Sequence, residues 1–182
     1  MTYSRRTFMI GTGAAAFGLA GAVSARVSAD PGDAAALDPA TAVAAVYAIK
    51  QVKARYFRAV DTKDWDLLKQ QVTPDVVIDT TGSAGIITVG DDAFIAYLRL
   101  TIGSATTVHQ GHMPEIEVQT ASTATGVWAL QDLLIWPGNV RVLGFGHYHE
   151  TYVRDGDHWR IKSNKLTRLY LDPIAEQKLF GV

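Results

Sequence analysis

The sequence contains no cysteine, which excludes both a disulfide framework and thiolate chemistry. Its formal net charge is −1, and such a balance offers no electrostatic footprint for nucleic acid. There is no internal repeat, and the one apolar run near the start is interrupted by glycine and falls short of the about 20 residues that span a membrane. These absences predict a small, uncharged or weakly charged partner, with no nucleic acid and no membrane for the mature form.

The first 29 residues have the order of an export signal. Arg5 and Arg6 precede the apolar run FMIGTGAAAFGLAGAV, and the small-residue segment SARVSAD follows it. This order predicts a signal peptide over residues 1–29 that is cleaved after Ala29. The paired arginines resemble the twin-arginine export signal, so the mature protein is expected in the periplasm or outside the cell. An uncleaved N-terminal anchor is the alternative.

The remaining chain is predicted to form one domain behind a linker. Residues 30–40 are typical of a linker, and residues 41–182 are long enough for a core and an internal pocket. Apolar residues recur at steps of three and four up to Val60, which predicts a long helix that Asp38 or Thr41 caps. The segments DWDLLKQQV and DDAFIAYLRLTI predict two shorter helices.

The second half of the sequence changes to the period of a β-strand. DVVIDT and GIITVG predict two short strands, and four long extended stretches follow from Thr106 onward, joined by the turns ASTA, PGN and RDGDH. Helices followed by a strand meander predict an α+β fold in which the N-terminal helices pack on one face of an antiparallel sheet. A strongly curved sheet under a long helix forms a cone, which has room for an apolar pocket.

Four segments in this order resemble a known superfamily: VDTKDWDLLKQQVTPDVVID, TTVHQGHMPEIEV, GHYHETYVRDGDHWRI and LTRL. The resemblance is to the nuclear transport factor 2-like superfamily, and within it to the SnoaL-like branch, which includes scytalone dehydratase and lindane dehydrochlorinase. It implies a cone-shaped, cystatin-like α+β barrel and a homodimer formed through the sheet. Because this scaffold carries isomerases, cyclases, dehydratases, hydrolases and binding modules, the fold alone does not decide the function.

Two function hypotheses follow from the resemblance. The first is a cofactor-free lyase, isomerase or cyclase that acts on a small cyclic apolar substrate. The second is a module that binds a small hydrophobic ligand without changing it. A role in subunit contacts alone is a third possibility, and dimerisation is compatible with all three.

Asp61 and His109 are the predicted catalytic pair. By motif position, Asp61 matches the family's acidic residue at the end of the first helix, and His109 matches the histidine that opens the first long strand. An imidazole is a useful base near neutral pH, and a carboxylate on one ring nitrogen leaves the other nitrogen as an acceptor for a substrate proton. The alternative is a structural hydrogen bond. Scytalone dehydratase carries tyrosines where this chain has Val60 and Thr80, which argues against that particular dehydration while keeping both positions as expected pocket residues.

Residues of the second long strand and the first helix complete the predicted pocket wall. Trp128 and Asp132 share a strand face by period two, and the resemblance implies that this face points inward. Trp128 would then be a flat wall for a ring-shaped ligand. Asp132 would be a second acid in the cone or, alternatively, the partner of an arginine or lysine. Tyr56, one turn before Val60, is expected to line the same cavity or to pack in the core.

The segment GHYHETY leaves the orientation of its strand open. The resemblance favours Tyr148 inward, where its hydroxyl could donate to an oxyanion, and the opposite parity would make His147 a substrate contact. Glu150 inward would need a cation or a polar network as partner, and the sequence assigns neither. His147 and His149, with a further histidine and a carboxylate, could ligate a metal ion, but this spacing alone is a weak signal, and neither a metal nor a cofactor is predicted.

Overall fold

The computed structural model describes residues 37–174, so the predicted signal peptide lies outside the described residues. Helix α1 (Pro39–Thr62) begins where the Asp38 carboxylate accepts a hydrogen bond from the backbone N–H of Thr41, as its sequence predicts. It ends at Lys63, whose left-handed φ of 61° turns the chain back on itself. This turn directs the chain from α1 into the short helix α2 (Trp65–Gln71).

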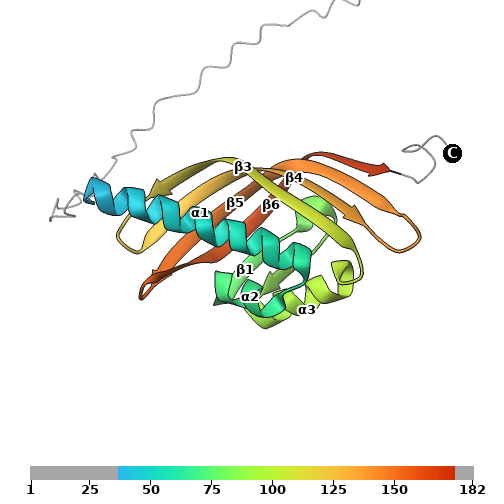
Figure 1. Ribbon diagram of the computed structural model, residues 1–182, viewed down its shortest axis with the longest axis horizontal. Helices are drawn as coiled ribbons and strands as arrows, with labels where there is room; N and C mark the ends of the chain where they lie inside the picture. The colour runs from blue at the N-terminus through green and yellow to red at the C-terminus, as the bar shows by residue number, and fades with distance from the viewer. Residues whose placement is uncertain (1–36, 175–182) are drawn as a thin grey trace, which may run out of the picture. The chain divides into compact units, whose positions relative to one another are not determined.

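The six strands form one mixed sheet in the order β2-β1-β6-β5-β4-β3 (Figure 1). All neighbouring pairs are antiparallel except β1 with β6, whose long connection through a helix and the meander allows them to run parallel. The α+β prediction is therefore confirmed, with this one parallel pair as a refinement. The strands are β1 (Val72–Asp79), β2 (Ile87–Val89), β3 (Thr106–Val118), β4 (Thr123–Ile135), β5 (Arg141–Asp155) and β6 (His158–Ile174).

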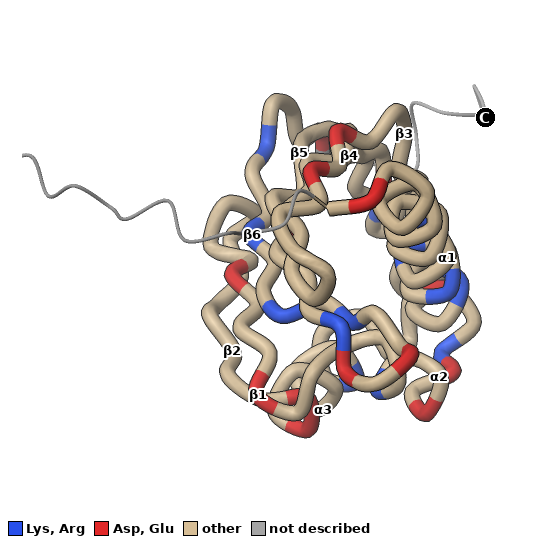
Figure 2. Tube along the Cα trace, turned by 90° about the vertical axis from the view of Figure 1, so that its left-hand side faces the viewer, with Lys and Arg blue, Asp and Glu red and all other residues tan. Residues whose placement is uncertain are grey.

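The helices lie on one side of the curved sheet, and the third, α3 (Asp91–Ile102), packs near β1 and β2 (Figures 1 and 2). Burial alternates strictly along β4, with every second residue fully covered. The inward residues of β4 and β5 meet the apolar stripe of α1, so the core lies between the sheet and the helices. Within residues 37–174, no helix combines the length and the hydropathy that crossing a membrane requires.

Two positions of β5 require glycine for different structural reasons. Gly146 lies at a shift of register between β5 and β6, where a side chain would run into the Thr167 carbonyl. Gly144 instead faces the interior: a Cβ there would lie 2.2 Å from an Asp132 carboxylate oxygen and 2.4 Å from the Arg168 guanidinium. The first glycine serves the irregular strand pairing, and the second leaves room for a pair of charged side chains.

Candidate active site

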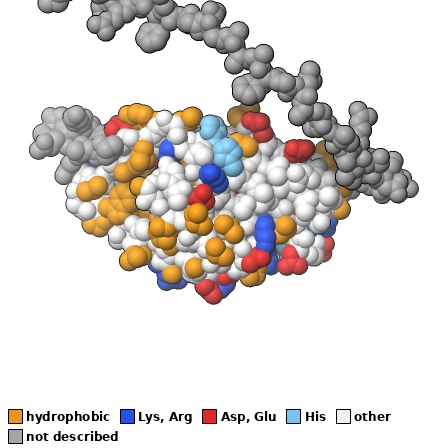
Figure 3. All heavy atoms as spheres, turned by 180° about the vertical axis from the view of Figure 1, so that it is seen from behind, with side chains coloured by type: hydrophobic (Ala, Val, Ile, Leu, Met, Phe, Trp, Pro, Cys, Tyr) orange, Lys and Arg blue, Asp and Glu red, His pale blue; other side chains and the backbone are white. Residues whose placement is uncertain are grey.

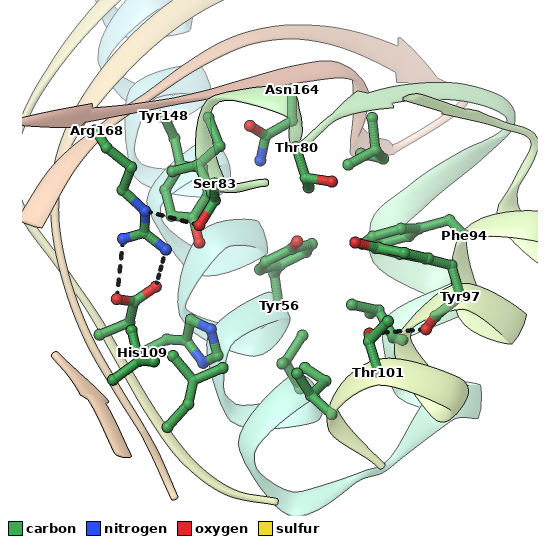
Figure 4. Close-up of a pocket in the computed structure, with 18 of the residues that line it drawn as sticks. Tyr56, Thr80, Ser83, Phe94, Tyr97, Thr101, His109, Tyr148, Asn164 and Arg168 are labelled. Carbon is green, nitrogen blue, oxygen red and sulfur yellow. Dashed lines mark hydrogen bonds and ion pairs between the residues drawn. The ribbon is translucent and has the colours of Figure 1, made fainter. Parts of the chain in front are cut away.

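A cavity of about 260 Å³ lies between the concave face of the sheet, α1 and α3 (Figure 4). Its apolar wall is formed by side chains from every layer of the fold, which are Val60, Ile78, Phe94, Leu98, Ile102, Leu134, Trp136, Val142, Leu166 and Leu171. Polar side chains are interspersed among them at Tyr56, Thr80, Ser83, Tyr97, Thr101, His109, Asp132, Tyr148, Asn164 and Arg168. Such a mostly apolar hollow with a few converging polar groups is typical of a site for a small molecule.

The structure brings Asp61 and His109 together at one end of this cavity. The Nδ1 atom of His109 lies 2.6 Å from Oδ1 of Asp61, and the backbone N–H of His109 donates to Oδ2 at 2.9 Å. The imidazole ring stacks on Phe57 with a centroid separation of 6.3 Å and an interplanar angle of 9°. Because both carboxylate oxygens and one ring nitrogen are engaged, the ring is held in a single orientation.

The carboxylate of this pair is stabilised in its charged form. Burial raises the pKa of Asp61, but the hydrogen bonds from the ring and the backbone of His109, with a further one from the Thr107 hydroxyl, outweigh burial and bring the pKa below its ordinary value. A carboxylate that stays ionised keeps a proton on Nδ1 and leaves Nε2 as the acceptor in the neutral ring. His109 itself lines the cavity.

The second predicted acid, Asp132, also lines the cavity but is neutralised there. Both its oxygens accept hydrogen bonds from Arg168, at 2.9 and 2.7 Å, in a bidentate pair. The Nε atom of Arg168 donates to the Ser83 hydroxyl at 3.0 Å, so the guanidinium is engaged on all three nitrogens. Asp132 is therefore a carboxylate paired with an arginine, the alternative that its sequence position also allowed, and this pair adds no net charge to the cavity.

Two tyrosines of the predicted set point into the cavity, as Figure 4 shows. Tyr56 comes from α1 and Tyr148 from β5, and neither hydroxyl forms a hydrogen bond with another group of residues 37–174. Burial raises the pKa of both phenols well above the ordinary value, so both remain protonated donors. Val60 and Thr80 line the cavity too, but the Thr80 hydroxyl is already occupied by the backbone of Ile86.

Two predicted contacts are placed elsewhere by the structure. Trp128 points inward and is buried, yet it does not line the cavity, because its indole N–H donates to the Tyr152 hydroxyl at 2.8 Å deeper in the core. His147 lies on the opposite face of the sheet beside His149, with ring centroids 6.2 Å apart. The strand parity that puts Tyr148 inside puts His147 outside. The predictions that Trp128 and His147 contact the ligand are therefore both corrected.

Sequence reasoning missed several lining residues. Arg168 lies within LTRL, where an alternating strand gives no sign that a cation turns inward to Asp132. Asn164, Phe94 and Trp136 also line the cavity and were not singled out. The lining position on α3 could have been found from helix spacing in DDAFIAYLRLTI, since Phe94 and Leu98 are four residues apart on one face.

Among residues 37–174, no group of three or more His, Asp or Glu side chains is arranged to hold a metal ion. The rings of His147 and His149 approach each other but do not belong to such a group. For acid–base chemistry the cavity offers an imidazole with its carboxylate, two phenols and a neutralised ion pair.

Comparison with known proteins agrees with this architecture. The model of the SnoaL-like domain matches residues 41–165. The "Probable cyclase FGR4" of Gibberella zeae is 27% identical over 134 residues, which are 67% of this chain and 89% of that protein.

Solved structures with the same fold include two of interest. The hexachlorocyclohexane dehydrochlorinase LinA-type3 from Novosphingobium barchaimii LL02 has a TM-score of 0.65 at 19% identity, covering 74% of this chain and 92% of its own. The Kfla4162 protein from Kribbella flavida has a TM-score of 0.66 at 25% identity, covering 74% and 95%. With its helices on a curved sheet, the cavity between them and a family match over most of its length, this chain belongs to the SnoaL-like domain family.

Proposed function

We propose that this protein is a cofactor-free enzyme of the lyase, isomerase or cyclase type that removes a carbon-bound proton from a small, neutral, cyclic substrate. The observation that carries the proposal is the contact of 2.6 Å between His109 and Asp61 at the wall of an apolar cavity. A relative named as a cyclase and a structural neighbour named as a dehydrochlorinase both fit reactions that begin with the loss of a proton.

The proposed reaction begins at the free nitrogen of the imidazole. Nε2 of His109 takes the proton from carbon, and the electron pair of the broken C–H bond forms a double bond while a leaving group departs or a neighbouring carbonyl becomes an enolate. Asp61 stabilises the imidazolium that results, because its two oxygens already face the Nδ1–H and the backbone N–H. A base placed in this way typically contributes 10²- to 10⁴-fold to the rate.

The phenols of Tyr56 and Tyr148 are the proposed donors to the substrate oxygen or leaving group. Both are neutral, both point into the cavity and neither hydroxyl is hydrogen-bonded to another group of residues 37–174. Asp132 has a positioning role in this scheme, since it holds Arg168 against Ser83 and keeps the cavity free of net charge. A neutral cavity favours a neutral substrate, because a charged one would lose its hydration without gaining a partner.

A test of the proposal does not require the identity of the natural substrate. A panel of cyclic ketones is incubated with the protein in D₂O, and deuterium incorporation beside the carbonyl is followed by mass spectrometry; chloride release from hexachlorocyclohexane is measured in parallel. Turnover of any member should fall 10²- to 10⁴-fold in His109→Ala, while binding of the same compound changes little. Equal exchange in wild type and His109→Ala would refute the base.

The binding module remains the second hypothesis and is separated by the same panel. A compound that binds the cavity and is returned unchanged, with equal affinity for wild type and Asp61→Asn, would favour it.

Export by a twin-arginine-type signal and dimerisation through the outer face of the sheet are further proposals. Apolar side chains and histidines lie side by side on the face turned away from the viewer of Figure 1 (Figure 3). Export is tested by measuring whether secretion depends on the predicted signal peptide. Dimerisation is tested by the mass of the mature form in analytical sedimentation.

A further inference from the structure

A chain of hydrogen bonds continues from the catalytic pair to the end of helix α1. The Thr107 hydroxyl of β3 lies 2.9 Å from Oδ1 of Asp61, the same oxygen that faces the imidazole. The Nζ atom of Lys63, two residues after Asp61, lies 2.9 Å from that hydroxyl and 3.1 Å from the Val60 carbonyl. Thr107 is 4% exposed, so no bulk water competes for its hydroxyl.

The direction of every bond in this chain is dictated by chemistry. A lysine ammonium has only donors and an ionised carboxylate has only acceptors. The Thr107 hydroxyl must therefore accept a hydrogen bond from Lys63 and donate its own hydrogen bond to Asp61. Because the hydroxyl oxygen accepts from a cation while its proton is held by the carboxylate, the hydroxyl is constrained from both sides, and hydrogen bonds of this kind polarise one another.

We propose that Thr107 and Lys63 are positioning residues for the Asp61–His109 pair, which fix the carboxylate and hold its basicity down so that the imidazole stays free to accept a proton. The inference rests on the proposed function for its purpose, but not for its test. Without such a relay, a buried carboxylate against an imidazole favours the imidazolium, which is useless as a base. The relay places one donor and one nearby positive charge on the far side of the carboxylate.

The conformation of Lys63 argues that the side chain matters. Its φ of 61° is one that L-residues rarely adopt, and glycine is the residue preferred at this position after a helix. The left-handed turn brings Nζ back over the helix end toward β3. Asp61 also attracts Lys63 electrostatically, although burial lowers the pKa of the ammonium. A lysine therefore occupies a strained position where its ammonium reaches Thr107.

The other groups near His109 are accounted for. Phe57 of α1 stacks on the ring and carries no charge. Asp132 of β4 is the residue opposite His109 across the strand pair, but both its oxygens are held by Arg168 of β6. Tyr148 of β5 remains a neutral phenol. Within residues 37–174, Thr107 thus acts directly on the Asp61 carboxylate, and Lys63 acts on it through the Thr107 hydroxyl.

The test uses NMR on the mature protein and needs no substrate. Two quantities are followed: the low-field resonance of the His109 Nδ1 proton, and the midpoint of the pH titration of the His109 ring protons. Thr107→Val removes the hydroxyl at nearly constant volume, and Lys63→Gly removes the ammonium while giving the turn its preferred residue. In each variant we expect the midpoint to move upward by about half a pH unit or more and the low-field resonance to broaden or disappear.

Matched controls separate this role from a structural one. Thr107→Ser keeps the hydroxyl and should restore both signals. Thr88→Val changes a buried threonine of β2 whose hydroxyl has no hydrogen-bond partner among the described residues, and it should leave them unchanged. If Lys63 merely ended the helix, Lys63→Gly would keep or raise thermal stability with an unmoved midpoint. That outcome, or an unmoved midpoint in Thr107→Val, would overturn the proposal.

The results distinguish a failure of the relay from a failure of the proposed enzymatic function. If the midpoint shifts as expected but no compound of the panel is turned over, the relay stands and the enzymatic role fails. If turnover depends on His109 while the midpoint is unmoved in both variants, the enzyme stands and the relay fails. Where a substrate is found, Thr107→Val should lower kcat about 10-fold or more with little change in KM, because it acts through Asp61 and does not touch the substrate.

Discussion

Helix α1 makes two acid–base contacts with the sheet, and their surroundings are opposite. Lys53 pairs with Glu150 at 2.5 Å, with both side chains 0% exposed. Asp61, about two turns further along the helix, pairs with His109 at 2.6 Å, with side chains 23% and 9% exposed. The first pair is sealed in the core, and the second forms part of a cavity wall.

Both oxygens of the sealed pair's carboxylate accept hydrogen bonds from the protein. Oε1 of Glu150 accepts from Lys53 and from the Asn164 amide at 2.8 Å, and Oε2 accepts from the Tyr152 hydroxyl. The ammonium lies over the rings of Tyr148, Tyr56 and Phe57, at 3.8, 4.5 and 4.6 Å from their centroids. The cavity pair leaves Nε2 of His109 without a hydrogen-bond partner among residues 37–174. The fully paired network holds the rings of Tyr56 and Tyr148 in place at the cavity, whereas the pair with a free ring nitrogen can act on a bound ligand.

The largest expected effect comes from breaking the sealed pair. Lys53→Met leaves the Glu150 carboxylate buried and unpaired, so the free energy of unfolding should fall by about 3–5 kcal/mol, measured by urea denaturation. Lys162→Met is the matched control, because Lys162 pairs with Asp75 at the surface, where an ion pair contributes little to stability. The double variant Lys53→Met/Glu150→Gln should recover part of the loss. Similar losses in the two single variants would remove the contrast.

A smaller effect is expected where the cavity's own ion pair is crowded. Gly144→Ala introduces a methyl group within 2.4 Å of both Asp132 and Arg168, so the bidentate pair must shift. We expect a loss of about 1–3 kcal/mol in unfolding free energy and weaker binding of any cavity ligand, measured by calorimetry. Unchanged binding and stability would mean that the pair moves aside without cost and does not shape the cavity.

The dependence of folding stability on pH in the acid range tests the charge of Asp61. Its pKa is lower in the folded protein than the ordinary value of 3.8, so the folded state binds the proton less tightly than the unfolded chain. The stabilisation is therefore complete above about pH 4 and is lost as the pH falls through the lowered folded pKa. The stability difference between wild type and Asp61→Asn should therefore shrink as the pH falls below about pH 4 and the folded-state carboxylate becomes protonated. A difference that stays independent of pH well into the acid range would contradict this assignment.

The smallest effect is expected on the other side of the sheet. His147→Ala changes a side chain that faces away from the cavity, so ligand binding and turnover should equal those of wild type, with stability within about 0.5 kcal/mol. Binding assays on His147→Ala and His109→Ala, made side by side, check this. A loss of binding in His147→Ala would restore the histidine to the ligand site.

Much of the fold could be predicted because its signals are local. Helix spacing located α1, and the change to period two located the four long strands. Motif position indicated Asp61 and His109, but the distance between them is not written in their spacing. One signal went unused: Lys53 falls on the buried stripe of α1, and Glu150 alternates with two tyrosines. A cation and an anion at apolar positions each need a partner, and each supplies the other.

What the sequence by itself determined was the order and type of the elements, the family and the positions of the two residues proposed for catalysis. Only the tertiary structure decided which face of β5 is inside, that Trp128 bonds to Tyr152 away from the cavity, and that Arg168 neutralises Asp132. The reason is physical: periodicity is written in neighbouring residues, whereas the choice of a partner depends on strand register and helix placement. Those are set by the packing of the whole core at once.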